Sequence, residues 1–222
     1  ALWGVPMVTA AARPEAPKKP NVILISLDTL RADRLGCYGF PRGTSPHLDS
    51  FAQTAHLFEN CFSPSSWTLP AHVAVMTGLH PAAHDSNNPD GKSMPTNART
   101  LSELAAAGGY RTAAFTGGAF VAQEWGFARG FERYNFFTKS QTGDAFGDSL
   151  AWLRSLNGAP FFLFFHTYAV HEPYTPPAEY LERFADPDYV GPLVRQFTFE
   201  NQDFVLALTA ADKRQVENLY LA

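Results

Sequence analysis

Short, continuous apolar runs constrain this chain more than any other feature of its sequence. Residues 21–27 form a run rich in β-branched side chains after a proline, and residues 161–165 read Phe-Phe-Leu-Phe-Phe. Such runs are typical of strands that are covered on both faces of a parallel sheet. We predict a strand at each of these runs and a third strand at residues 110–115.

Helical segments separate these strands, and glycine or proline marks most of their ends. The alternation predicts an α/β protein built as a three-layer sandwich with a mainly parallel central sheet. In such a sheet, ligands gather beyond the carboxyl ends of the strands. The predicted helices cover residues 45–55, 68–78, 101–107, 148–156 and 212–222, and a further strand is predicted at residues 56–62.

Composition narrows the class of protein. With 222 residues the chain can bury a large core as one domain or as part of one. Hydrophobic residues make up 45% and charged residues 17%, so disorder is not expected. The net charge of -4 and the absence of a Lys/Arg block exclude a basic surface for nucleic acid. From residue 13 onward, no window is apolar for long enough to span a bilayer.

Residues 1–20 differ in character from residues 21–222. Residues 1–12 are apolar and then small, like the end of an export signal with its cleavage site, although an ordinary alanine-rich tail has the same composition. Residues 13–20 predict an extended linker. Export would place the protein in the periplasm or outside the cell. Two cysteines, Cys37 and Cys61, would then permit one disulfide, and two buried free thiols are the alternative.

Residues 63–78 place one hydroxyl, that of Thr68, where a loop becomes a helix. Pro70 suits the first helical turn, and the apolar residues after it continue the helix toward a core. An N-cap is one interpretation of Thr68, because threonine is common in that role. An active-site hydroxyl is the other, because the unpaired N–H groups of the first turn favour an anionic ester.

Further polar groups follow the predicted strands. Asp28 ends the first run, and His166 and His171 follow residues 161–165. An aspartate in this position is either a ligand for a hard metal ion or a turn-former. His171 lies in a proline-rich loop that can hold its imidazole against a substrate oxygen, or it is a surface residue. Together with Thr68, these groups can converge at one sheet edge, where a metal ion beside an alcohol makes the alcohol nucleophilic.

Five collinear segments carry a resemblance to one known family. Residues 21–39 read Asn-Val-Ile-Leu-Ile-Ser-Leu-Asp-Thr-Leu-Arg-Ala-Asp-Arg-Leu-Gly-Cys-Tyr-Gly. The other segments are Pro-His-Leu-Asp at 46–49, the stretch at 68–78, a region with Gly-Tyr-Arg-Thr and Arg-Gly-Phe at 101–131, and the histidine-containing loop at 161–177. This pattern resembles the sulfatase family, within the alkaline-phosphatase superfamily, over about residues 20–180.

The resemblance implies an alkaline-phosphatase-like fold and a role for each matching residue. Asp28 matches the first metal-binding aspartate, Thr68 the nucleophile position, and His171 the histidine that contacts the ester or its leaving group. It also implies one divalent metal ion, with Ca, Mg or Mn preferred and Zn as a further option, held in part by Asp28 and Thr68.

The nucleophile motif departs from the family pattern. Most sulfatases have Cys or Ser followed by x-Pro-x-Arg, and that Cys or Ser is oxidised to formylglycine. Here the motif reads Thr68-Leu69-Pro70-Ala71-His72. No formylglycine is expected, because oxidation of a threonine at Cβ would give a ketone, whereas threonine attacks phosphorus directly in related phosphodiesterases and phosphotransferases. His72 replaces the arginine and is a further candidate catalytic residue.

Two more departures concern the substrate and the metal. Residues 116–120 lack the Lys-x-His pair that grips sulfate in many sulfatases, and nothing after His171 matches the Asp-Asn or Asp-His pair that completes the metal site. Asp186 and Asp188 lie in a proline-containing loop and are expected to be solvated turn residues. We therefore expect residues 21–222 to be the N-terminal part of a sulfatase-like catalytic domain, incomplete at the C-terminus.

The expected function is metal-dependent hydrolysis of a sulfate ester or related phosphate ester, carried by a small molecule or a glycan, with Thr68 in the nucleophile position. One alternative is a phosphodiesterase or phosphotransferase with a threonine nucleophile. A second alternative is a homologue that has lost catalysis and binds an anionic or glycan ligand.

Overall fold

A parallel β-sheet forms the centre of the protein. The structure is a computed structural model that describes residues 19–86, 93–199 and 202–222. Within these residues four strands form one sheet in the order β1-β4-β2-β3, and each neighbouring pair is parallel. The strands are β1 (Val22–Leu27), β2 (Arg111–Thr116), β3 (Arg133–Phe136) and β4 (Phe161–Thr167).

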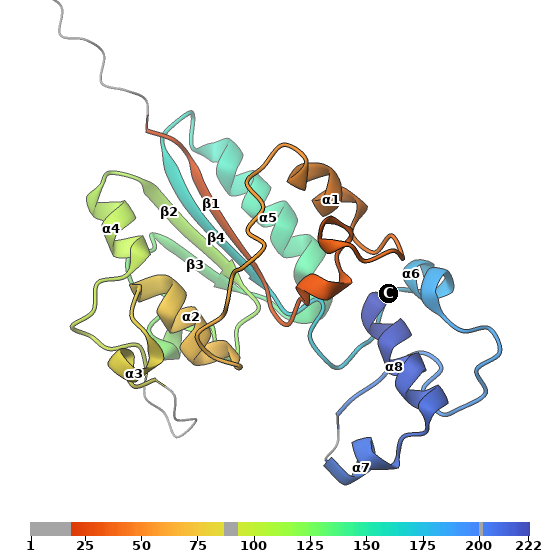
Figure 1. Ribbon diagram of the computed structural model, residues 1–222. Helices are drawn as coiled ribbons and strands as arrows, with labels where there is room; N and C mark the ends of the chain where they lie inside the picture. The colour runs from red at the N-terminus through yellow and green to blue at the C-terminus, as the bar shows by residue number, and fades with distance from the viewer. Residues whose placement is uncertain (1–18, 87–92, 200–201) are drawn as a thin grey trace, which may run out of the picture.

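Helices connect these strands and extend beyond them (Figure 1). α5 runs along one face of the sheet, α2 and α4 lie on the other, and α6, α7 and α8 form a group to one side. The helices are α1 (Pro46–Ala52), α2 (Thr68–Thr77), α3 (Pro81–His84), α4 (Leu101–Ala107), α5 (Thr142–Ser155), α6 (Ala178–Phe184), α7 (Gln202–Ala207) and α8 (Ala210–Leu221). Short 3₁₀ helices occur at Ala32–Arg34, Gly36–Tyr38, Gln123–Trp125 and Lys139–Gln141.

The central strand β4 divides two hydrophobic cores. Phe162 and Phe164 pack with Leu69 and Val73 of α2 on one face. Leu163 and Phe165 lie on the opposite face, in the core that includes Trp152 of α5. Successive side chains of a strand point to opposite faces, so the all-apolar run in β4 fills both cores at once. The three-layer α/β sandwich with a parallel sheet is therefore confirmed.

The predicted elements are mostly confirmed, but α3, α6 and α7 were not predicted, and two corrections concern strands. Residues 56–62 do not form a strand: Phe58 and Phe62 are 70% and 85% exposed, and no described strand pairs with this segment. A segment without a pairing partner does not form a stable strand. β3 was missed, because its short sequence Arg-Tyr-Asn-Phe mixes polar and aromatic residues and has no continuous apolar run.

Other predictions from the sequence have different outcomes. Cys37 and Cys61 are free thiols, the first partly buried and the second exposed, so neither the disulfide nor the pair of buried thiols is present. Asp186 and Asp188 lie in an exposed turn, where the Asp188 N–H donates to the Asp186 carboxylate at 3.0 Å. The interpretation of residues 1–20 as a signal remnant and linker falls almost wholly outside the described residues and stays a prediction. In the part that is described, none of the helices combines the length and the apolar character that crossing a membrane requires.

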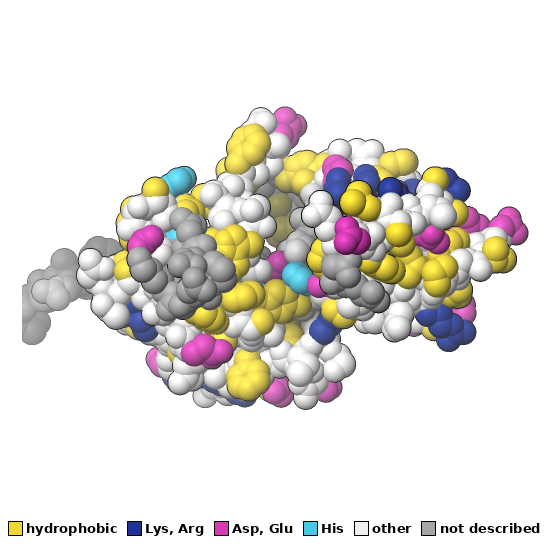
Figure 2. Space-filling model, turned by 90° about the horizontal axis from the view of Figure 1, so that it is seen from below, with side chains coloured by type: hydrophobic (Ala, Val, Ile, Leu, Met, Phe, Trp, Pro, Cys, Tyr) yellow, Lys and Arg dark blue, Asp and Glu magenta, His cyan; other side chains and the backbone are white. Residues whose placement is uncertain are grey.

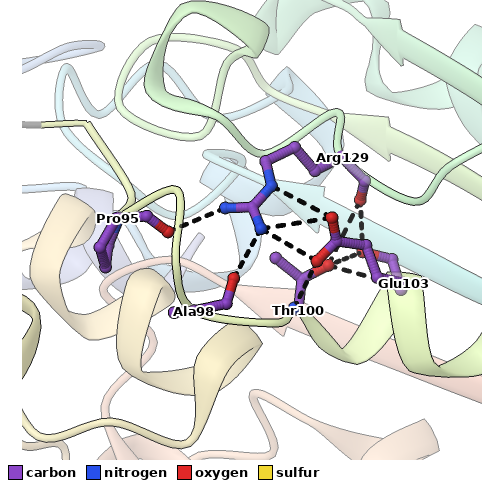
Figure 3. A network of polar contacts seen from close by, with 6 residues as sticks. Pro95, Ala98, Thr100, Glu103 and Arg129 are labelled. Atoms are coloured by element: carbon purple, nitrogen blue, oxygen red, sulfur yellow. Dashed lines mark hydrogen bonds and ion pairs between the residues drawn. The ribbon is translucent and has the colours of Figure 1, made fainter.

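Arg129, in the loop before β3, holds the segment that leads into α4 (Figure 3). The Arg129 guanidinium donates to the Pro95 carbonyl at 3.0 Å, to the Ala98 carbonyl at 2.5 Å and to the Glu103 carboxylate at 3.0 Å. Glu103 also closes a capping box with Thr100 at the start of α4. Gly130 follows with φ +77, and an added Cβ would lie 2.3 Å from the Glu103 nitrogen. The Arg-Gly-Phe segment singled out in the sequence therefore has a structural role.

We expect Arg129→Ala to lower the free energy of unfolding by about 2 to 3 kcal/mol, because it removes the guanidinium donor from two carbonyl oxygens and the ion pair from the Glu103 carboxylate. Arg111→Ala is the matched control, since its ion pair with Glu132 is about half exposed and such pairs contribute about 0 to 1 kcal/mol. Urea denaturation of both variants measures the difference. Equal losses would contradict the role assigned to Arg129.

Candidate functional site

The site begins at the first residue of α2. Thr68 is that residue, and the preceding Trp67 has the extended backbone of an N-cap (φ -141, ψ 162), so the N-cap interpretation of Thr68 is wrong by one position. No side chain caps this end of the helix among the described residues. Buried Leu69 and Val73 anchor α2 in the core, and Gly78 ends it with a left-handed backbone. The Thr68 side chain is thereby held, half buried, near the carboxyl ends of β1 and β4.

His72 lies one helical turn after Thr68 and is 8% exposed. Its Nδ1 is 2.8 Å from the Thr68 carbonyl oxygen, and its Nε2 is 2.8 Å from Ser26 Oγ. A carbonyl only accepts hydrogen bonds, so Nδ1 carries the hydrogen and Nε2 keeps a lone pair that the Ser26 hydroxyl faces. Burial, followed by the charge of His166, lowers the pKa of His72 and favours its neutral form.

His166 has the opposite arrangement of ring nitrogens. The Gly117 N–H donates to its Nδ1 at 3.3 Å, so its Nε2 carries the hydrogen and faces the Asp28 carboxylate at 3.4 Å. Both residues are buried, His166 completely. Parallel pairing explains their meeting, because Ser26 and His166 are register partners and the Asp28 N–H donates to the Thr167 carbonyl at 3.0 Å.

The Asp28 carboxylate is ionised despite its burial. Burial raises its pKa, but hydrogen bonding from His166 and Thr68, together with the charges of His72 and His166, brings the pKa below its usual value. The Thr68 hydroxyl is therefore a close neighbour of Asp28. A charged carboxylate held by polar hydrogens beside a hydroxyl can bind a cation or accept a proton.

The donor atoms of this site fit a divalent cation in part. One ligand atom from each of Asp28, His72 and His166 lies within 4.8 Å of the other two. The Asp28 carboxylate and His72 Nε2 both offer lone pairs, and His72 binds a backbone carbonyl through Nδ1, as metal-ligating histidines usually do. His166 fits less well, because its lone pair accepts from the fixed backbone N–H of Gly117, whereas the Ser26 hydroxyl that faces His72 Nε2 can rotate away. The contact of His166 with Asp28 is that of an orienting donor.

Tyr168 lies between His166, which is in β4, and His171, which is in the loop after that strand. Its ring packs edge-on against His166 at 4.6 Å and against His171 at 5.3 Å between centroids. Burial and the negative charge of Asp28 raise the pKa of Tyr168 to about 12, although Thr68 and the Phe120 backbone act in the opposite direction. The phenol therefore keeps its hydrogen at neutral pH.

His171 lies one ring beyond the cluster of Asp28, Thr68 and His72. Its Nδ1 is 2.6 Å from the Glu172 carbonyl oxygen. The Lys139 ammonium donates to the carbonyls of His171 and Pro173 at 2.6 and 2.7 Å, which fastens the loop to the end of β3. The structure thus brings three of the four predicted site residues together and connects the fourth to them through Tyr168.

Sequence reasoning missed Ser26, Tyr168 and Lys139 as parts of this site. Ser26 had a signal, because it precedes Asp28 by two positions in a strand and so points to the same face. Tyr168 and Lys139 had no such signal in the sequence, since their places depend on packing between segments far apart in the chain.

On the face of the molecule seen in Figure 2, a histidine and an acidic side chain lie side by side near the middle, among apolar side chains.

Comparisons of the sequence with known proteins show the family to which the chain belongs. A family model described as Sulfatase matches residues 20–193. Bovine (Bos taurus) arylsulfatase A is 34% identical over 119 residues, which is 50% of this chain and 23% of the relative. The Delta 4,5-hexuronate-2-O-sulfatase of Bacteroides thetaiotaomicron is 27% identical over 147 residues, which is 64% of this chain and 29% of the relative.

Solved structures show the same fold at low identity. The phosphonate monoester hydrolase of Agrobacterium radiobacter superposes with a TM-score of 0.76 at 18% identity, covering 91% of this chain and 56% of that one. The C-terminal periplasmic domain of EcEptC from Escherichia coli, solved with Zn, has a TM-score of 0.65 at 17% identity, covering 94% of this chain and 58% of that one.

The parallel sheet and its helices give the protein an alkaline-phosphatase-like α/β fold. The match of the family model over residues 20–193 then shows that the chain belongs to the Sulfatase family. The chain spans about a quarter of the length of the curated relatives named above, 23% and 29%.

The hydrogen bonds predict opposite tautomers for the two buried histidines in the metal-free protein at pH 7.5. His72 should carry its hydrogen on Nδ1 and His166 on Nε2, because their partners are a carbonyl and an N–H. Long-range ¹H–¹⁵N NMR spectra distinguish protonated from unprotonated ring nitrogens, and His72→Gln and His166→Gln assign the signals. The same tautomer at both residues would contradict the arrangement described above.

Proposed function

We propose that the whole protein hydrolyses sulfate esters or related phosphate esters, with the Thr68 hydroxyl attacking sulfur or phosphorus. Membership of the Sulfatase family supports the class of reaction. The observation that carries the proposal for this chain is the place of Thr68: its hydroxyl stands beside the ionised Asp28, at the N-terminus of a helix anchored in the core. An anionic ester there meets the positive end of the α2 dipole.

Each residue around Thr68 has its own proposed role in the reaction. The Thr68 hydroxyl lies close enough to Asp28 to help lower the pKa of that carboxyl, so Asp28 is proposed to orient the hydroxyl and accept its hydrogen. His166 donates to Asp28 and fixes the carboxylate. His171, in the loop fastened by Lys139 and packed against Tyr168, is proposed to donate to the ester or its leaving group. The helix N-terminus favours the negative charge of the ester throughout.

A divalent cation is proposed as the cofactor, with Asp28 and His72 as ligands from this chain and Thr68 beside them. Such an ion would lower the pKa of an adjacent hydroxyl and neutralise the charge of the ester. An imidazole together with a carboxylate suits Zn²⁺ or Mn²⁺ better than Ca²⁺, which prefers oxygen ligands alone. This donor set moves zinc and manganese ahead of the calcium and magnesium expected from the family resemblance.

Phosphate esters are the second candidate substrate class, and one observation favours them. The segment Thr116-Gly117-Gly118 carries no cation, and Tyr168 packs over Gly117 instead. Threonine also cannot form the formylglycine aldehyde, because its Cβ bears a methyl group. Parallel assays with an aryl sulfate and an aryl phosphodiester distinguish the two classes, and small molecules and glycans remain the proposed carriers of the ester.

Thr68→Ala should lower kcat for the preferred ester by about a thousandfold or more, because it removes the attacking oxygen. Thr77→Ala is the matched control: its hydroxyl bonds the Val73 carbonyl at the other end of α2, and it should keep kcat within about twofold. Steady-state kinetics of the full-length protein measure both. Undiminished turnover by Thr68→Ala would refute the nucleophile assignment, and turnover of neither ester would favour a non-catalytic binding protein.

Removal of the metal with a chelator should abolish turnover, and Zn²⁺ or Mn²⁺ should restore it. Asp28→Asn and His72→Ala should each weaken metal binding by at least about tenfold, and His166→Gln should weaken it less, because the glutamine amide can still donate to Asp28. His56→Ala, at an exposed histidine, serves as the control. Isothermal titration calorimetry measures the affinities. Equal affinity in Asp28→Asn and the wild type would contradict the proposed ligand set.

A further inference from the structure

We infer that Tyr220 is a positioning residue for Asp28: its hydroxyl holds the strained turn that follows β1 and thereby fixes the direction of the Asp28 carboxylate. The inference rests on the proposed function, in which Asp28 binds the cation and orients the Thr68 hydroxyl. Tyr220 lies in α8, beyond the residues that the family model matches, and none of the sequence motifs described above contains it.

The first observation is strain in the backbone next to Asp28. The Leu30 N–H donates to the Leu27 carbonyl at 3.3 Å and closes a turn. Asp28 and Thr29 are its two central residues, and Thr29 has a φ of 60. Turns with a positive φ at this position usually carry glycine or asparagine, because a β-branched side chain is strained there. Contacts from elsewhere in the structure must therefore keep Thr29 in this conformation.

The second observation is a pair of hydrogen bonds between one hydroxyl and this turn. Tyr220 Oη accepts from the Arg31 N–H at 2.8 Å and donates to the Thr29 carbonyl at 3.1 Å. These two backbone groups belong to the peptide units on either side of Leu30. The hydroxyl uses its single hydrogen and a lone pair in the two bonds, and it fixes the chain directly after the strained residue.

The third observation is that the sheet holds Asp28 on its other side. The Asp28 N–H donates to the Thr167 carbonyl at 3.0 Å, so the backbone is anchored to β4 before the strained residue and to Tyr220 after it. The Asp28 carboxylate is buried and lies 3.4 Å from His166 Nε2. A rotation of the turn would carry the carboxylate away from this donor.

The end of α8 is a firm support for the phenol. Leu219 is buried in the hydrophobic cluster that α8 shares with Leu193. Glu217 pairs with Arg34 at 3.1 Å, in the segment that follows β1. Both contacts lie within one helical turn of Tyr220, so the place of its ring does not depend on the two hydrogen bonds of its hydroxyl.

The ring of Tyr220 also contacts the second functional loop. It packs edge-on against Tyr174 at 5.5 Å between centroids, and Tyr174 lies in the loop that carries His171. The Thr29 hydroxyl donates to the Val170 carbonyl in the same loop at 3.2 Å. Tyr220 therefore contacts both segments that carry proposed catalytic groups after β1 and β4.

Tyr220→Phe tests the inference, because it removes both hydrogen bonds and keeps the ring. In the full-length protein, the dissociation constant for Zn²⁺ should rise at least about tenfold, which is the effect typical of losing a residue that orients a metal ligand. Isothermal titration calorimetry with Zn²⁺ alone measures this constant without any ester. An unchanged dissociation constant overturns the inference.

Tyr38→Phe is the matched control. The Tyr38 hydroxyl also binds the backbone, donating to the Phe58 carbonyl at 2.9 Å, and this contact involves no residue of the site. Both variants lose a tyrosine hydroxyl with a backbone partner, so both should lower Tm. Only Tyr220→Phe should weaken the binding of Zn²⁺. Equal weakening in the two variants would show a general loss of stability and would overturn the inference.

Thr29→Gly tests whether the strain is what Tyr220 opposes. Glycine adopts a φ of about 60 without cost, so in the Thr29→Gly background Tyr220→Phe should change the Zn²⁺ dissociation constant by less than about twofold. Thr29→Val is the control, because it also loses the bond to Val170 but keeps the branched Cβ. In that background Tyr220→Phe should have its full effect. Equal effects in both backgrounds would overturn the inference.

Crystal structures of the metal-free protein provide a readout that depends on neither turnover nor metal. In Tyr220→Phe, Thr29 should leave the left-handed region, and the Asp28 carboxylate should move out of hydrogen-bond distance of His166 Nε2. In Tyr38→Phe, both features should stay as in the wild type. If the wild type hydrolyses neither ester, the proposed function fails while this comparison still decides the role of Tyr220. An unchanged turn in Tyr220→Phe overturns the inference.

Discussion

The parallel pairing of β1 with β4 is the constraint on which the rest of the site depends. Its register sets Ser26 opposite His166, and the next backbone hydrogen bond, from Asp28 to Thr167, carries the pairing one residue past the end of β1. Two residues at the carboxyl ends of adjacent strands are thereby fixed with the precision of a sheet. A shift of one residue would turn Ser26 and His166 to opposite faces and would dismantle the cluster.

His72 and His166 are both buried, but their hydrogen-bond partners give them opposite tautomers. A helix carbonyl leaves His72 with a lone pair that faces the Ser26 hydroxyl, and a loop N–H makes His166 present a hydrogen to the Asp28 carboxylate. One imidazole is therefore available to a cation and the other orients the carboxylate. The distinction depends on single backbone groups of Thr68 and Gly117, which explains how a site of few residues separates its roles.

The elements that could be read from the sequence are those that local patterns encode. Continuous apolar runs predicted β1 and β4, the segment after the glycine stop of α4 predicted β2, and glycine and proline placed the ends of α2 and α4 correctly. The run at residues 56–62 looked equally strand-like and forms none, because a strand requires a pairing neighbour that a local pattern cannot supply. Asp28 and Thr68 were likewise accessible as residues at element ends, and His72 through its place in the family's nucleophile motif. The place of Tyr168 depends instead on the room left at Gly117, which is distant in the chain.

The separation of Asp28 and His166 in the chain, 138 positions, has a consequence for biosynthesis. During synthesis, β1 emerges long before its only described strand partner, β4, so Asp28 remains without His166 until nearly three quarters of these 222 residues have been made. Thr68 and His72, in contrast, meet within a single turn of helix. The nascent chain can therefore bring Thr68 and His72 together early, whereas Asp28 and His166 meet only when β4 pairs with β1. A cation or anion that needs all of these residues finds no complete site before then.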